Sequence, residues 1–409
     1  MKWEKIEFGE LYLIPSKNGL NRPSRVRGSG YKMINMGELF ANDRIKDIPM
    51  ELVPLNDREI ESSNILEQDL LFARQSIVAS GAGKCSIVLE VPEITTFESH
   101  LIRVRLNSDR ANPLFYYYYF KTPFANMKSL VQQGVQAGIR GSELKNLNVF
   151  YPPLSTQRRI ASILSAYDDL IENNLKRIKL LEEKAQMHYK IDFGEYQFGD
   201  KEPQNLPKGW SVKSIGDIYG KLESGSRPKG GIDKELKEGI ASVGAENVIG
   251  LGKYNYQSEK LINEAFFENM NRGKIENKDI LIYKDGAYIG KTTLFQDDFP
   301  HDKCCVNEHV FLLRSIDELY QNYLFFTLYQ KLYFNKMQQL NANAAQPGIN
   351  QESLKSLRIL WPSKSVIEEF NDKVESLMKL IFVLAKQNTK LREARDILLP
   401  KLMNGQIEV

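Results

Sequence analysis

The sequence predicts an α+β protein in which two mixed α/β modules, related by a pseudo-twofold axis, are separated by a pair of long antiparallel coiled-coil helices. Three observations predict this class. The chain of 409 residues repeats itself, each copy ends in a long heptad-patterned segment, and the sequence between these segments is rich in short strand-like runs and turns.

The repeat sets the expected domain boundaries. Gly138-Ile139 and Tyr151-Pro152 match Gly348-Ile349 and Trp361-Pro362 at a shift of about 210 positions, and His100 and Arg105 match His309 and Arg314 at a slightly smaller one. Solenoid repeats are much shorter, roughly 20 to 50 residues, so this period indicates two tandem domains. We therefore expect modules at residues 1–151 and 196–361, each followed by a long helix, at 152–195 and 362–409.

The composition predicts a cytoplasmic protein. Hydrophobic residues make up 42% of the chain and charged residues 26%, and neither a signal peptide nor a long apolar span is visible. Three cysteines are too few for a disulfide framework. The net charge of +3 is only faintly basic, so we expect partners to share in any binding of nucleic acid.

The two heptad-patterned segments predict long helices. Apolar residues recur at alternating steps of four and three from Ile160 to His188 and, at corresponding positions, from Phe370 to Leu398. A helix of about 35 residues spans roughly 50 Å, so each one must pack on something beyond its own module. Pro400 is expected to end the second helix and to leave Asn404-Gly405 in a turn.

Asparagines in the two seams predict how these helices cross. An antiparallel crossing at their midpoints places Asn174 opposite Asn388, and a buried amide pair would fix the register at some cost in stability. The same register pairs Ile171 with Leu391, Leu181 with Ile381 and Leu164 with Leu398. Alternatively, both asparagines lie at solvated edges of the seam.

The modules contain strand, turn and aromatic signals. Residues 65–73, 278–283 and 292–295 predict strands, and the turn 285–291 leads into the last of them. Aromatic runs at 115–120 and 323–333 are more typical of a core than of a ligand platform.

Basic and amide-rich loops are the candidate binding segments. The stretch 15–32 carries five basic residues and no acidic one, and the loop 224–231 repeats this pattern at a corresponding place. Glutamine and asparagine cluster at 132–136 and 338–350, and such amides can pair with adenine edges as arginine pairs with guanine. Ordinary solvated turns remain the alternative. Arg74 and Lys284 are also candidates, and each directly follows a predicted buried strand. The full set of candidate DNA-binding residues is Lys17, Arg22, Arg25, Arg27, Lys32, Arg74, Gln136, Arg227, Lys229, Lys284, Asn343 and Gln346.

Catalytic and cofactor motifs do not appear in the sequence. Gly83-Lys84 and Gly290-Lys291 lack the earlier glycine that a phosphate-binding loop needs, so they predict hairpin turns. The run from His301 to His309 contains two adjacent cysteines, which are poor tetrahedral partners for zinc. We expect no metal, no cofactor and no catalytic dyad.

The first helical segment carries a family resemblance. It reads PPLSTQRRIASILSAYDDLIENNLKRIKLLEE from Pro152 and is echoed by AAQPGIN and LKSLRILWP in the second copy. With Leu206–Trp210, the DGAYIGK turn and the closing LLPKLMNGQIEV, this closely resembles the DNA specificity subunit of type I restriction-modification enzymes. The second copy departs from the pattern, because Pro362-Ser363-Lys364-Ser365 lacks the glutamine that Gln157 supplies in the first.

The resemblance implies a non-catalytic subunit with two target recognition domains, each reading one half of a bipartite, asymmetric site in double-stranded DNA. It also implies that the helix pair sets the unread gap and docks two methyltransferase subunits, which carry the S-adenosylmethionine chemistry and recruit restriction subunits. Two other classes remain as alternatives: a methyltransferase or nuclease in its own right, and a coiled-coil scaffold that binds no DNA.

Overall fold

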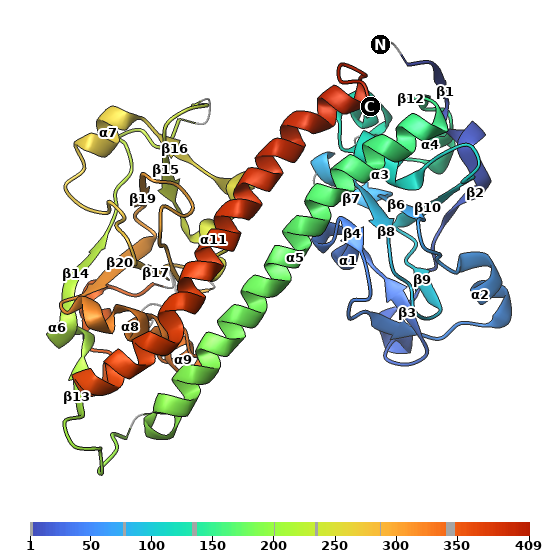
Figure 1. Ribbon diagram of the computed structural model, residues 1–409. Helices are drawn as coiled ribbons and strands as arrows, with labels where there is room; N and C mark the ends of the chain where they lie inside the picture. The colour runs from blue at the N-terminus through green and yellow to red at the C-terminus, as the bar shows by residue number, and fades with distance from the viewer. Residues whose placement is uncertain are drawn as a thin grey trace. The chain divides into compact units, whose positions relative to one another are not determined.

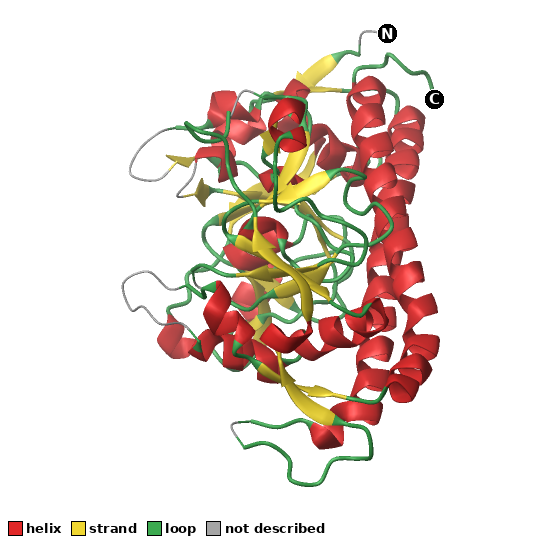
Figure 2. Cartoon of the chain, turned by 90° about the vertical axis from the view of Figure 1, so that its left-hand side faces the viewer, coloured by secondary structure: helices red, strands yellow, loops and turns green. Residues whose placement is uncertain are grey.

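A computed structural model describes residues 3–76, 79–132, 137–199, 201–233, 236–286, 288–340 and 348–409 (Figure 1). The chain divides into two compact units. Unit 1 comprises Met1–Asp169 and Leu391–Val409, and unit 2 comprises Leu170–Lys390. Both mix strands and helices, as Figure 2 shows by colour, which confirms the predicted fold class at that level.

The main sheet of unit 1 is mostly antiparallel, in the order β2-β10-β6-β8-β4. Its strands are β2 (Tyr12–Asn18), β10 (Leu101–Leu106), β6 (Leu70–Ala73), β8 (Cys85–Val88) and β4 (Arg44–Ile45). A second sheet has the order β5-β3-β9, with β3 and β9 parallel, and short ladders join β1 to β12 and β7 to β11. The remaining elements are β5 (Glu51–Val53), β3 (Tyr31–Ile34), β9 (Thr95–Phe97), β1 (Lys5–Glu7), β12 (Asn148–Phe150), β7 (Gln75–Ser76), β11 (Ala137–Gly138), α1 (Met36–Ala41), α2 (Asp57–Ser63), α3 (Pro113–Phe120) and α4 (Gly141–Lys145).

Unit 2 repeats most of this topology, but its main sheet has no described strand that corresponds to β4. Its main sheet has the order β14-β20-β17-β18, a second sheet has the order β16-β15-β19 with β15 and β19 parallel, and β13 pairs with β21. The elements are β14 (Tyr219–Ser224), β20 (Val310–Ser315), β17 (Ile280–Tyr283), β18 (Thr292–Leu294), β16 (Leu261–Ile262), β15 (Ile240–Val243), β19 (Cys304–Val306), β13 (Ser211–Ser214), β21 (Arg358–Trp361), α6 (Ile215–Ile218), α7 (Glu264–Glu268), α8 (Gln321–Leu328), α9 (Lys331–Gln339) and α10 (Gln351–Lys355). The sequence repeat is therefore a repeat of fold.

The predicted long helices are α5 (Leu154–Phe193) and α11 (Lys364–Met403). The expectation that Pro400 ends α11 is wrong, because the helix continues through it for three more residues. A proline lacks the N–H that would bond to the preceding turn, and its ring bends the helix at that point. Only three helical residues follow Pro400, so this bend displaces little of the helix. The carbonyl of Pro400 still accepts from the N–H of Asn404 at 3.1 Å. Gly405, with a φ of 75°, then forms the expected turn.

The start of α5 is fixed from inside the domain. Oε1 of Gln157 accepts from the backbone N–H of Asn112 at 2.8 Å, and its Nε2 donates to the carbonyl of Pro152 at 2.9 Å. Gln157 and Ile367, its counterpart in α11, are both fully buried. The missing glutamine of the second copy is therefore a difference in internal packing.

The two buried strands begin later than expected, because a tight turn precedes each of them. Gln68 and Lys278 adopt left-handed φ angles of 68° and 65°. The next residues, Asp69 and Asp279, are fully buried and each accepts two hydrogen bonds from an arginine of the neighbouring strand, Arg105 at 2.7 Å and Arg314 at 2.8 and 2.9 Å. Each unit therefore has one such ion pair, which links two neighbouring central strands of its own main sheet: β6 with β10 in unit 1, and β17 with β20 in unit 2.

Aromatic residues fill the core of each unit, as their sequence predicts. Tyr116, Tyr117 and Tyr118 of α3 are almost completely buried. In unit 2 the ring of Tyr320 stacks on Trp361 with 3.9 Å between centroids.

Candidate nucleic-acid interface

Two arginines of the loop after β2 hold that loop against its neighbours in unit 1. Arg22 donates to Glu59 of α2 at 2.5 Å, and Arg27 donates to Glu51 of β5. The hydrogen bond from Arg22 lowers the pKa of Glu59, so this pair stays charged at neutral pH. Ion pairs near the surface contribute only about 0 to 1 kcal/mol, which means that a phosphate could replace either carboxylate at small cost.

The other three basic residues of the stretch 15–32 are Lys17 at the end of β2, Arg25 in the loop and Lys32 in β3, and they differ in their surroundings. Lys32 pairs with Asp47 at 2.7 Å and with Glu93 at 2.6 Å, and these hydrogen bonds raise the pKa of Lys32. Lys17 donates to a backbone carbonyl of α2. Arg25 is exposed, and among the described residues no partner is found for it. Of the five, Arg25 is the side chain most available to a ligand.

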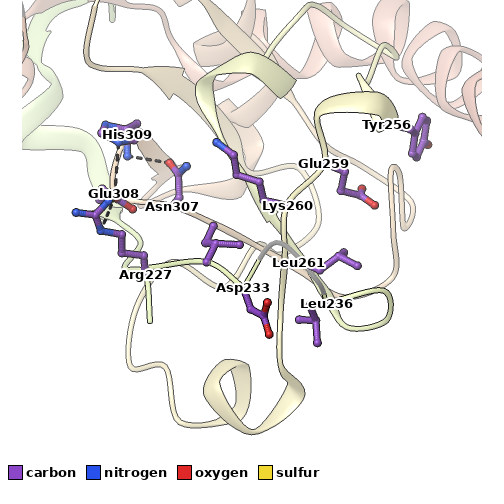
Figure 3. A pocket seen from close by; sticks show the side chains of 11 residues that line it. Arg227, Asp233, Leu236, Tyr256, Glu259, Lys260, Leu261, Asn307, Glu308 and His309 are labelled. Atoms are coloured by element: carbon purple, nitrogen blue, oxygen red, sulfur yellow. Dashed lines mark hydrogen bonds and ion pairs between the residues drawn. The ribbon is translucent and has the colours of Figure 1, made fainter. Parts of the chain in front are cut away.

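The corresponding loop of unit 2 presents Arg227 and Lys229. The Arg227 side chain is 64% exposed and its Nε lies 3.2 Å from Oε1 of Glu308 (Figure 3). Lys229 is exposed, and within the described ranges it has no polar partner. Both cations can therefore reach a ligand without first leaving a buried site.

Arg227 lies at the rim of a hollow of about 500 Å³, shown in Figure 3. Ionisable side chains contact one another in a row along this rim and just beyond it: Nδ1 of His309 is 2.9 Å from Asp285, its Nε2 is 3.6 Å from Glu308, and Glu308 contacts Arg227. The remaining lining residues are Ile232, Asp233, Leu236, Tyr256, Glu259, Lys260, Leu261 and Asn307. Arginine pairs with guanine edges and glutamate with cytosine edges, so Arg227 and Glu308 give the rim the chemistry for reading bases. Asn307 is buried, and its Oδ1 accepts the backbone N–H of His309 at 2.8 Å.

Glycine allows each basic loop to begin against the neighbouring strand. A Cβ on Gly225 would lie 1.5 Å from the carbonyl oxygen of Val306, and one on Gly19 would lie 2.1 Å from that of Phe97. No side chain fits at either place. This close approach of the backbone at Gly225 to Val306 brings the loop of Arg227 beside residues 307–309, and the N–H of Gly225 donates to the carbonyl of Asn307 at 3.1 Å.

Arg74 and Lys284 occupy equivalent positions just after β6 and β17. Nη1 of Arg74 donates to the carbonyl of Ser99 at 3.3 Å, and Nζ of Lys284 lies 5.1 Å from the ring centroid of Phe311. Their carbonyls each accept from an isoleucine N–H at 2.9 Å, that of Ile139 in unit 1 and that of Ile349 in unit 2. These isoleucines follow the amide-rich segments, whose candidate residues Gln136, Asn343 and Gln346 lie outside the described residues.

The helix seam shows the amide pair that the crossing register predicts. Nδ2 of Asn174 donates to Oδ1 of Asn388 at 3.0 Å, and both residues are buried, which excludes the solvated-edge alternative. Ile381 belongs to the apolar cluster against which Leu181 packs in unit 2, as Leu164 does for Leu398 in unit 1. Ile171 and Leu391 fall in different units, and their pairing stays a prediction.

The described residues also bear on metal binding and on membrane spans. Among the described residues, no group of three or more histidine, cysteine or acidic side chains is arranged to hold a metal ion. Nor does any helix in these ranges have the length and apolar character of a membrane span.

Comparison with known proteins assigns the family. The sequence signature of the type I restriction modification DNA specificity domain matches residues 1–183 and again residues 207–391. The chain belongs to this family. As a specificity subunit, it recognises DNA sequence for a type I restriction-modification system.

Relatives of this specificity subunit carry the same description. It is 28% identical to the type I restriction enzyme MjaIX specificity subunit of Methanocaldococcus jannaschii, over 72% of this chain and 69% of that one. It is 23% identical to the putative MjaX specificity subunit of the same organism, over 100% of this chain and 94% of that one. The crystal structure of the S subunit from M. genitalium shares the fold, with a TM-score of 0.59 and 15% identity over 98% and 96% of the two chains.

Sequence reasoning missed several residues of this specificity subunit. Asn307, Glu308 and His309 contribute to the rim of the hollow but were not among the candidates. The match between His100 and His309 in the repeat was the sequence signal that could have found this loop, and in the structure both side chains are 50% exposed.

Proposed function

We propose that each unit of this specificity subunit reads one half of a bipartite, asymmetric DNA site, and that α5 and α11 set the length of the unread gap. The observation that supports this most directly is the repeat of one sheet topology with a basic loop at the same point of each copy. Two reading units held at a fixed separation accept two short sites at one spacing, because distance and helical phase both change with each base pair.

The reading side chains in this proposal are the exposed cations and the rim of the hollow. Arg25 in unit 1 and Arg227 in unit 2 are free or held by a weak exposed pair, so each can contact phosphate or a guanine edge. The carboxylate of Glu308 supplies an acceptor for other bases, while Asn307 is buried and its Oδ1 accepts the N–H of His309 at 2.8 Å. Lys17, Arg22, Arg27 and Lys32 shape the loop that carries Arg25.

Exposed apolar residues on the long helices support docking of two methyltransferase subunits. Leu180 and Ile191 of α5 are 65% and 69% exposed, and Ile397 of α11 is 58% exposed. The spacing of Leu180 and Ile191 corresponds to about three helical turns and places them on one face of α5, where a partner could cover both. The corresponding positions to Leu180 and Ile191 in α11 are Lys390 and Lys401, so the two docking surfaces differ.

These partners would supply what the specificity subunit lacks in this proposal. The methyltransferase subunits carry out methyl transfer from S-adenosylmethionine and recruit the restriction subunits, while this chain is non-catalytic and needs no cofactor. A net charge of +3 fits this division, since the partners would provide much of the phosphate neutralisation. We place the assembly in the cytoplasm, where free thiols such as Cys85, Cys304 and Cys305 persist.

Methylome sequencing tests the proposal. A host that carries the gene for this chain should show one methylated motif made of two short parts separated by a fixed gap, and deletion of the gene should abolish that motif. Restoring the gene from a plasmid is the control. A motif that persists after deletion, or a methylated site without a gap, would contradict the proposal.

A further inference from the structure

Among the described residues, the polar contacts that join α5 to α11 within one unit include three that the sequence repeat does not duplicate; in a further one, Nδ2 of Asn174 also lies 3.5 Å from Oε1 of Gln387. In unit 1, Arg395 donates to Asp168, which also accepts from the hydroxyl of Tyr118 at 2.6 Å. In unit 2, Asn174 donates to Asn388. Also in unit 2, Lys373 donates to both carboxylate oxygens of Asp192, at 2.8 and 2.9 Å.

The sequence repeat maps every one of these three polar contacts onto an apolar pair. The contact of Asp168 with Arg395 corresponds to Met378 and Ala185, which are buried in one cluster of unit 2. The contact of Asn174 with Asn388 corresponds to Leu384 and Ile178 of the same cluster. The contact of Asp192 with Lys373 corresponds to Leu402 and Ile163 of the unit 1 cluster.

This asymmetry matters because duplicated helices can pair in more than one way. The apolar seam is shared, so α5 of one chain could pair with α5 of a second chain in the same antiparallel register. Asp168 would then face Ala185, and Asn174 would face Ile178, with each mismatch occurring twice. Two α11 helices would likewise place Arg395 against Met378 and Asn388 against Leu384.

The buried polar groups are costly, which argues that they serve pairing and not stability. Asn388 is 1% exposed and its Nδ2 has no hydrogen-bond partner. Asp168 is 7% exposed. Replacing buried polar pairs with apolar residues of similar size is often neutral or stabilising, whereas leaving one charge or amide unpaired in an apolar seam is strongly unfavourable.

We propose that these three contacts are a pairing code that lets α5 accept α11 and reject a second copy of itself, so that a long chain with two similar helices does not join other copies through like helices. Asp168 with Arg395 and Asn174 with Asn388 carry most of the discrimination. The pair of Lys373 with Asp192 contributes less, since the lysine side chain is 39% exposed.

The first test removes the code from the full-length chain. Four polar seam residues are each replaced by the residue at the corresponding position of the other helix: Asp168→Met, Asn174→Leu, Asn388→Ile and Arg395→Ala. Tyr118→Phe is added to avoid an unpaired hydroxyl. Chains with two different affinity tags are co-expressed and purified through both tags in turn. The variant should keep its helical circular dichroism and melting temperature, yet its mixed dimers should exceed those of the wild type at least tenfold. A folded variant with no more mixed dimer than the wild type would overturn the proposal.

The second test uses charge complementarity and remains decisive if the first variant fails to fold. Asp168→Arg in one tagged chain and Arg395→Asp in the other place like charges within each chain, but opposite charges between α5 of one and α11 of the other. Co-expression should yield a 1:1 mixed dimer in at least tenfold excess over self-association of either variant. The double variant Asp168→Arg/Arg395→Asp, which restores a pair within one chain, should behave as the wild type. Equal amounts of mixed and self-associated species would refute the code.

Discussion

Removal of Arg314 should destabilise unit 2 far more than removal of a neighbouring exposed cation. Arg314 donates two hydrogen bonds to Asp279 and one to Glu276 at 2.7 Å. Asp279 is fully buried and otherwise accepts only the backbone N–H of Glu276 among its described contacts, at 2.7 Å. In the variant Arg314→Met, the Asp279 carboxylate would remain in an apolar site without its cation. Breaking a buried pair in this way costs about 3 to 5 kcal/mol.

A matched control separates this effect from a general loss of positive charge. Lys221→Met removes a cation that lies 3.7 Å from Glu276 on the surface of the same sheet. Exposed pairs of this kind contribute about 0 to 1 kcal/mol. The two variants lose the same charge, so the difference between them measures the buried carboxylate.

Hydrogen exchange measured by mass spectrometry is the assay, because it reads the two units separately. A loss of about 3 to 5 kcal/mol should accelerate exchange of the amides of β17 and β20 by roughly two to four orders of magnitude. Peptides from β6 in unit 1 serve as an internal reference. If exchange in β17 rises less than about tenfold, or equally in Lys221→Met, the buried pair does not stabilise the sheet as argued.

The same variant predicts a pH dependence. Burial raises the pKa of Asp279, while the hydrogen bonds from Arg314 oppose that rise, so loss of the arginine should raise it further. A carboxyl whose pKa is higher in the folded state than in the unfolded state favours folding most when it is protonated, and this contribution is lost as pH rises through the folded-state pKa. Urea denaturation should therefore show a deficit of Arg314→Met relative to the wild type that shrinks as pH falls from 7 toward 4. A deficit that is constant or grows on acidification would contradict the assignment.

Three further predictions concern DNA and the backbone. Arg25→Ala and Arg227→Ala should each weaken DNA binding by the assembled methyltransferase. A loss that is uniform across sequences, with the slope of log affinity against log salt concentration lower by about one, indicates a phosphate contact, and a loss of about 1 to 3 kcal/mol for one base indicates readout. Unchanged binding would remove that loop from the interface. Insertion of four residues into both α5 and α11 adds about 6 Å of helix and should lengthen the preferred gap by one or two base pairs, as methylation of a gap series would show; an unchanged gap means that the helices do not set it. Gly225→Ala should lower the melting temperature of unit 2 markedly, because the added Cβ meets the carbonyl oxygen of Val306. Gly230→Ala, at a position with open space but a positive φ, is the control and should cost only about 1 kcal/mol. Similar losses in the two variants would mean that the backbone at Gly225 moves away from Val306 easily.

Much of the architecture could be read from the sequence, because repeats and heptads are local or self-referential signals. The seam spacing, together with an assumed antiparallel crossing at the helix midpoints, predicted Asn174 opposite Asn388 but left a solvated edge as the alternative, so only the structure decided between the two. The strand bounds were less accessible: an apolar run does not show that Asp69 and Asp279 are buried within a turn. The prediction that Pro400 ends the second helix was wrong for a similar reason, since the effect of a proline depends on how much helix follows it.

The binding face was harder to predict than the fold. Positive residues in a glycine-rich loop indicated a ligand, but Arg22, Arg27 and Lys32 each lie beside a carboxylate that is distant in the sequence. Arg25 lies in the same stretch but, among the described residues, beside no such carboxylate, and composition alone could not distinguish it from Arg22, Arg27 and Lys32. The loop of Asn307 to His309 was visible only as a faint match in the repeat.

The sequence by itself determined the duplicated topology, the two long helices and the family, because these depend on periodicities that any segment carries along its own length. Only the tertiary structure decided which cations are neutralised, which aspartates are buried with arginines, and which seam residues meet. Those outcomes depend on contacts between residues up to hundreds of positions apart, and the free energy of a charge or an amide is set by its surroundings and not by its neighbours in the chain.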